Sequence, residues 1–120
     1  MKWEIDDNKQ IHQQLIDGIT RRIFEGIYKP GDKIPSVRDL AIEARVNPNT
    51  IQKALQELED NKILETRRTI GKFITKDVKR LMKIKENLSS EIAQKFIKEM
   101  RILGIGNEEI KNIIEREIKK

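Results

Sequence analysis

The chain has 120 residues, of which 38% are charged and 37% are hydrophobic, and its formal net charge is +5. It contains no cysteine, which excludes disulfides and cysteine catalysis, and no run approaches the roughly 18 apolar residues that a membrane span needs. Its N-terminus also lacks the apolar core of a secretion signal, so we expect a cytoplasmic protein with no membrane partner.

Three short helices are predicted in the first half of the chain. The first runs from about residue 9 to 25, where isoleucine and leucine recur every four residues, and a Pro-Gly turn follows at residues 29–32. The second helix begins after the N-cap Ser36. The third spans residues 47–60, with Asn47 as its N-cap and a proline at its first helical position.

A small β-hairpin is predicted next. Residues 63–66 and 73–75 have strand character, and the basic residues 67–72 form the tip between them. Three short helices followed by a basic hairpin are the plan of a winged helix-turn-helix, which we assign to residues 1–76. The fold class is therefore mainly α with one small hairpin.

The tail, residues 77–120, is predicted to be a two-helix dimerisation segment. A long helix ends at Gly104, and a last helix begins with Asn107 as its N-cap. Two such helices cannot bury their apolar stripes on each other alone, so we expect a homodimer. The residues expected at its interface are Leu81, Leu88, Ile92, Phe96, Met100, Ile110 and Ile114. The alternative is a tail that packs back on its own winged helix.

The third helix carries the candidate DNA-recognition residues. In a helix-turn-helix, the second helix of the pair enters the major groove with its N-terminal residues. Its face away from the apolar side carries Asn49, Gln52 and Lys53, whose amides suit adenine and whose ammonium suits guanine. Asn47 and Thr50 can donate to phosphates at the helix start. The alternative is a solvated face without a ligand.

Cationic side chains flank this helix. Arg38 lies on the second helix, and Arg67, Arg68 and Lys72 lie in the hairpin. We expect these residues to follow the phosphate backbone or to enter the minor groove.

An ordered signature extends through residues 30–41, 46–55 and 58–59 to Gly71 and Phe73. With it, the chain resembles the DNA-binding domain of GntR-type regulators over residues 11–74. The Asn-Pro-Asn-Thr start of the third helix and the short tail resemble the YtrA-type branch, whose members dimerise through the tail and lack a large ligand domain. The resemblance implies DNA contacts at Ser36, Arg38, Asn47, Asn49, Thr50, Gln52, Arg67, Arg68 and Thr69.

Three positions depart from the family pattern. Pro48 stands where many members have an arginine that contacts guanine, so the operator is expected to differ at the matching base. Thr69 replaces a usual glycine and Lys72 a usual threonine, which makes the hairpin tip stiffer and more cationic.

The sequence thus predicts a sequence-specific DNA-binding regulator, a repressor that binds an inverted-repeat operator in double-stranded DNA as a homodimer. The alternative is a winged-helix protein-interaction module in a larger assembly. An enzyme is disfavoured because no nucleophile–base pair or phosphate loop is present, and a single histidine, His12, does not suggest a metal site. No cofactor is predicted, and a small-molecule effector stays unidentified.

Overall fold

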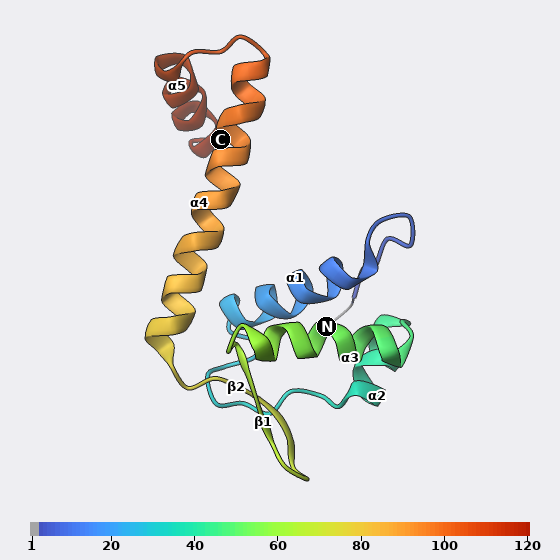
Figure 1. Cartoon of the computed structure of the whole chain (residues 1–120). Coiled ribbons are helices and arrows are strands. Elements are labelled where there is room, and N and C mark those ends of the chain that lie inside the picture. The colour runs from blue at the N-terminus through green and yellow to red at the C-terminus, as the bar shows by residue number, and fades with distance from the viewer. Residues whose placement is uncertain (1–2) are drawn as a thin grey trace. The chain divides into compact units, whose positions relative to one another are not determined.

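The computed structural model describes residues 3–120, which contain five helices and one two-stranded antiparallel hairpin. In chain order the elements are α1 (Ile11–Phe24), α2 (Val37–Ala44), α3 (Pro48–Asp60), β1 (Leu64–Arg67), β2 (Gly71–Ile74), α4 (Val78–Ile102) and α5 (Asn107–Ile118) (Figure 1). They form two compact units, of which the first ends at Leu81 and the second is Met82–Lys120. The predicted mainly α fold, a winged helix-turn-helix followed by two helices, is confirmed.

Helix α3 is the centre of the first unit, and it contacts α1, α2 and β1. Its apolar residues recur at positions i, i+3, i+4 and i+7, which places them on one helical face. Ile51, Ala54, Leu55 and Leu58 are all buried. Their burial fixes α3 from one side and leaves its opposite face to solvent.

Local hydrogen bonds define the start of both helices of the helix-turn-helix. The Ser36 Oγ accepts a bond from the Asp39 N–H at 3.1 Å, and the Asn47 Oδ1 accepts one from the Asn49 N–H at 2.8 Å. Both predicted N-caps are therefore confirmed. Between the helices, Arg45 has φ +56°, a left-handed conformation that ends α2 and turns the chain toward α3.

The strands of the hairpin lie closer to its tip than the predicted residues 63–66 and 73–75, and the tip is shorter than predicted. Leu64 pairs with Ile74 and Arg67 pairs with Gly71, so Arg67 belongs to the strand and residues 68–70 form the tip. Lys33 adds a single bridge to Phe73 before α2 begins.

The second unit consists of α4 from Met82 onward and α5. Gly104, with φ +79°, ends α4, and the N–H of Ile105 bonds back to the carbonyl of Met100 at 3.1 Å. The chain then folds back so that α5 lies beside the last turns of α4 (Figure 1). Ile110 of α5 is buried between them, with an exposed fraction of 5%.

Three predictions about the tail need correction. The N-cap of α5 is Gly106, and Asn107 is the first helical residue; its Oδ1 accepts a bond from Arg101 at 3.3 Å. Leu81 is only 6% exposed and belongs to the first unit, which therefore extends beyond residue 76. Because its side chain is already buried within the chain, Leu81 is not available for a dimer contact. The same holds for Ile110, another predicted interface residue, which is 5% exposed. Within residues 3–120, no helix is both long and apolar enough to cross a membrane.

Candidate nucleic-acid interface

The N-terminal half of α3 presents an exposed polar face. Asn49, Gln52 and Lys53 are exposed, and Thr50 is half-buried. They lie opposite the buried Ile51 side of the helix, so the core that fixes α3 also directs these groups to solvent. This is the arrangement that base recognition in a major groove needs.

The carboxylates of α3 stand apart from that polar face. All three lie in the C-terminal half of the helix, at Glu57, Glu59 and Asp60. Each has a polar partner in the protein: His12 at 3.3 Å for Glu57, Lys72 at 2.7 Å for Glu59 and Gln56 at 3.0 Å for Asp60. Only Lys72 among these partners is a cation, so Glu57 and Asp60 keep their negative charge. The N-terminal half, residues 48–56, carries no acidic side chain, and this is the half that would approach a phosphate-lined groove.

The two N-cap residues are exposed hydrogen-bond donors as well as caps. In Ser36 and Asn47 the side-chain oxygen accepts a backbone N–H, which leaves the hydroxyl hydrogen and the amide NH2 to donate. Donors at helix N-termini suit phosphate oxygens better than base edges. Arg38, one residue into α2, is exposed and has no ion pair with any residue from 3 to 120.

The hairpin holds its two arginines differently. The Arg67 guanidinium carbon lies 4.0 Å from the centroid of the Phe73 ring, a cation–π contact that orients the side chain. Arg68 at the tip is exposed and makes no ion pair among the residues that the structure describes. Phe73 was not predicted to support the site. The register could have identified it, since Arg67 and Phe73 are diagonal neighbours on one face of the hairpin.

Lys72 lies in a different environment from the other cations of the hairpin. Its Nζ donates to the Glu59 Oε2 at 2.7 Å and to the Thr66 Oγ1 at 2.8 Å. The hydrogen bond from Lys72 is also the main reason that the pKa of Glu59 lies below its usual value, so Glu59 is charged at neutral pH. Lys72 therefore ties the hairpin to the C-terminal half of α3, a role that the sequence analysis missed.

Thr69 lies at the tip with φ +64°, a conformation that β-branched residues rarely adopt. This backbone conformation suits the glycine that is usual at this position in GntR-type regulators. The threonine side chain keeps this turn under strain.

We expect Thr69→Gly to raise the free energy of unfolding by roughly 0.5–1 kcal/mol, because relief of left-handed strain exceeds the extra entropy of glycine in the unfolded chain. Urea denaturation followed by circular dichroism measures it. A matched control is Thr66→Gly, in the adjoining regular strand, which should destabilise the protein. A loss of stability in Thr69→Gly as well would contradict the assigned strain.

Comparisons with known proteins agree with this geometry. Residues 11–74 match the family model described as bacterial regulatory proteins of the gntR family. The HTH-type transcriptional regulator YhcF of Bacillus subtilis is 40% identical over 110 residues, covering 92% of this chain and 91% of YhcF. The HTH-type transcriptional repressor YtrA of the same organism is 38% identical over 101 residues, covering 83% of this chain and 78% of YtrA.

A solved structure is similar over nearly the whole chain. A GntR family transcriptional regulator from Listeria monocytogenes superimposes with a TM-score of 0.89 at 39% sequence identity. The match covers 93% of this chain and 98% of that one, so it includes the two-helix tail as well as the winged helix-turn-helix.

Proposed function

The chain belongs to the GntR family of bacterial regulatory proteins, and from that premise we propose that it regulates transcription by binding a specific operator in duplex DNA. The resemblance to this family and to its YtrA-type branch is confirmed by the relatives. The observation that carries the proposal is the division of α3: its first half has exposed amides and an ammonium, and its carboxylates are confined to the second half.

In the proposed complex, the N-terminal half of α3 lies in the major groove. Asn49 and Gln52 pair with adenine edges and Lys53 contacts a guanine, as their hydrogen-bonding groups allow. Ser36, Asn47 and Thr50 donate to phosphates and fix the register. The base opposite Pro48 is not recognised by an arginine, so the operator differs there from those of relatives that have one.

The hairpin supplies the cationic arm of the interface. Arg67, oriented by Phe73, and Arg68 contact phosphate or the minor groove, together with the strained tip at Thr69. We give Lys72 a positioning role in place of the direct contact expected from sequence, because its ammonium already has two partners.

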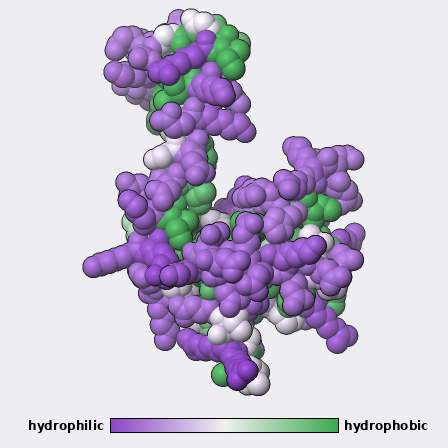
Figure 2. Space-filling view, in the orientation of Figure 1, coloured by the Kyte–Doolittle hydropathy of each residue, from purple (hydrophilic) through white to green (hydrophobic). Residues whose placement is uncertain are grey.

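We also propose that the protein is a homodimer formed through the second unit. Leu88 and Ile92 on α4 and Ile114 on α5 are exposed within a single chain. Hydrophobic residues also reach the surface of the α4–α5 pair in the space-filling view (Figure 2). A second copy would bury these side chains, and a two-fold dimer would then require an inverted-repeat operator.

We infer whether the protein represses or activates transcription from the name of a relative. YtrA is named a transcriptional repressor, and we infer the same role for this chain, by occupation of promoter DNA in the cytoplasm. The relatives are transcription regulators, and we propose a regulator without enzymatic activity or cofactor. We assign no small-molecule effector.

Salt dependence tests the proposed interface. If Arg38, Arg67 and Arg68 each neutralise one phosphate, the log–log plot of affinity against salt should have a slope of about −2.7 for each protomer, at about −0.9 for each phosphate. Fluorescence anisotropy with DNA from upstream of the protein's own gene measures it. Lys98→Ala, an exposed change in the second unit, is the control that should leave the slope unaltered. A slope near zero would refute this binding mode and favour the protein-interaction alternative.

A further inference from the structure

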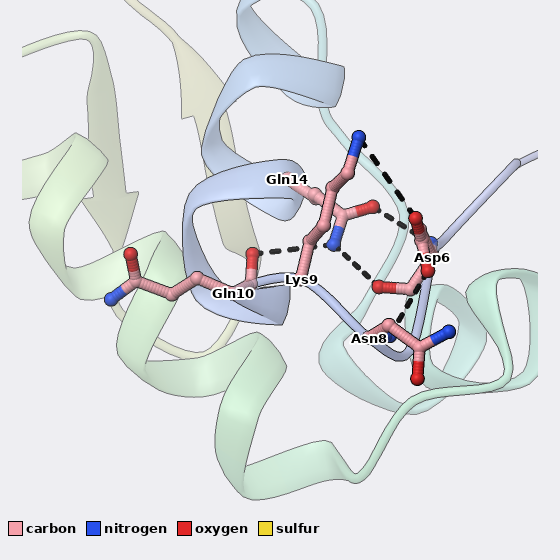
Figure 3. A network of polar contacts seen from close by, with 5 residues as sticks. All are labelled: Asp6, Asn8, Lys9, Gln10 and Gln14. Atoms are coloured by element: carbon pink, nitrogen blue, oxygen red, sulfur yellow. Dashed lines mark hydrogen bonds and ion pairs between the residues drawn. The ribbon is translucent and has the colours of Figure 1, made fainter.

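The segment before α1, residues 3–10, is held against that helix by the side-chain amide of Gln14, which bonds to the backbone as a neighbouring strand would. The Asp6 N–H donates to the Gln14 Oε1 at 2.8 Å, and the Gln14 Nε2 donates back to the Asp6 carbonyl at 2.9 Å (Figure 3). The same Nε2 also lies 3.3 Å from the carbonyl of Gln10. One amide thus satisfies both backbone groups of Asp6, and we name residues 3–10 the N-terminal strap.

The strap also has a turn of its own. The Asp6 carboxylate accepts a bond from the Asn8 N–H at 3.0 Å, and the Lys9 N–H donates to the Asp6 carbonyl at 3.1 Å. These bonds are local, so they fix the path of the strap as it enters α1.

Trp3 packs against Gly18 and Arg22 of α1, and we call these two residues the socket. Its ring centroid lies 3.6 Å from the guanidinium carbon of Arg22, whose Nη1 donates to the Gly18 carbonyl at 2.9 Å. Arg22 is only 6% exposed. A Cβ atom on Gly18 would collide with the Trp3 ring. Glycine in a helix interior is less stable than alanine, and here the missing side chain makes room for the indole.

The docked strap borders the helix-turn-helix. Strap residues and the end of α2 surround one hollow of about 510 Å³, lined by Trp3, Glu4, Ile5, Asp7, Glu43, Ala44 and Arg45. Arg45 is the left-handed residue that makes the turn between α2 and α3. The strap therefore lies next to the residue at which the chain turns from α2 to α3.

We propose that Trp3 is a positioning residue for DNA binding: its docking at Gly18 and Arg22 holds the strap beside the α2–α3 turn and thereby sets α3 for the major groove. The proposal rests on the proposed function. It predicts two separate effects, one on the socket itself and one on operator affinity.

The socket is tested without DNA by a double-mutant cycle. In the full chain, Gly18→Ala should lower Tm because the new methyl group expels Trp3. In a Trp3→Ala background the same change should raise Tm by about 4–8 °C, the ordinary gain of alanine over glycine in a helix of a small domain. Trp3 is the single tryptophan, so its emission should also shift to longer wavelength in Gly18→Ala. The control Gln13→Ala, exposed on the same helix, should change Tm equally in both backgrounds.

Operator affinity tests the positioning role. Well below Tm, where circular dichroism shows a folded chain, Trp3→Ala should weaken operator binding about tenfold, and Trp3→Phe should restore most of it. If the effect of Gly18→Ala on Tm depends on Trp3 but Trp3→Ala binds the operator as tightly as wild type, the proposal is overturned and the strap is a purely structural element. If Gly18→Ala changes Tm equally in the wild-type and Trp3→Ala backgrounds, Trp3 does not pack against Gly18 and the socket assignment is wrong. If wild-type protein binds no DNA while the Tm cycle is coupled, both the positioning role and the proposed function fail, but the socket stands.

Discussion

Ile92→Glu should convert the protein to a monomer at micromolar concentration and lower its operator affinity by roughly a hundredfold or more. Ile92 is 70% exposed within one chain, so the substitution removes no packing from the folded protomer. In a two-fold dimer, each copy would lose a buried side chain contributing about 1.5–3 kcal/mol and gain a carboxylate that has no partner in an apolar contact. Losing the second winged helix also removes half of the DNA contacts.

Gln94→Glu is the matched control for this experiment. Both substitutions add one negative charge to the same stretch of α4, but two residues along a helix turn the side chain to nearly the opposite face. Gln94→Glu should therefore leave the dimer intact. Phe96 is less suitable as a test, since it is half-buried within the second unit and its replacement would also remove packing inside the protomer.

Sedimentation velocity checks the oligomeric state, and footprinting checks its consequence for DNA. A dimer should protect two inverted half-sites presented about one helical turn apart, roughly 34 Å, or a multiple of it. Wild-type protein that sediments as a monomer, or that protects one unrepeated half-site, would overturn the dimer proposal.

Local features of the site could be predicted from sequence because they depend on neighbours in the chain. Ser36 and Asn47 cap helices whose first turns lie within three residues, so residue type and spacing were enough. The exposed face of α3 followed in the same way from the apolar period of that helix.

Contacts between elements could not be predicted in this way. Lys72 was grouped with the arginines of the hairpin, but its partner Glu59 is fixed by how the hairpin packs on α3. The docking of Trp3 on Gly18 joins residues of two segments that have no shared periodicity. The burial of Leu81 in the first unit likewise depends on tertiary packing, which helical spacing alone does not reveal.

Asn49→Ala and Gln52→Ala should each lower the preference for operator over scrambled DNA by about 5- to 150-fold, the equivalent of roughly 1–3 kcal/mol for a good bidentate pair. Both side chains are exposed on α3, and neither is a helix cap through its side chain, so their removal should leave the fold unchanged. The expected loss is in binding to the correct sequence, while affinity for scrambled DNA stays the same.

Arg68→Ala provides the contrasting variant. Arg68 is exposed at the hairpin tip, free of the aromatic contact that orients Arg67, and it should act on phosphates alone. Its removal should weaken binding to operator and to scrambled DNA by similar factors and reduce the magnitude of the salt slope by about 0.9 for each protomer. Competition anisotropy with both DNAs at two salt concentrations separates the two classes of residue. If the Asn49 and Gln52 variants keep full preference for the operator, α3 does not recognise bases through this face. If Arg68→Ala alters the preference, the hairpin takes part in base recognition, and its contact lies in the minor groove.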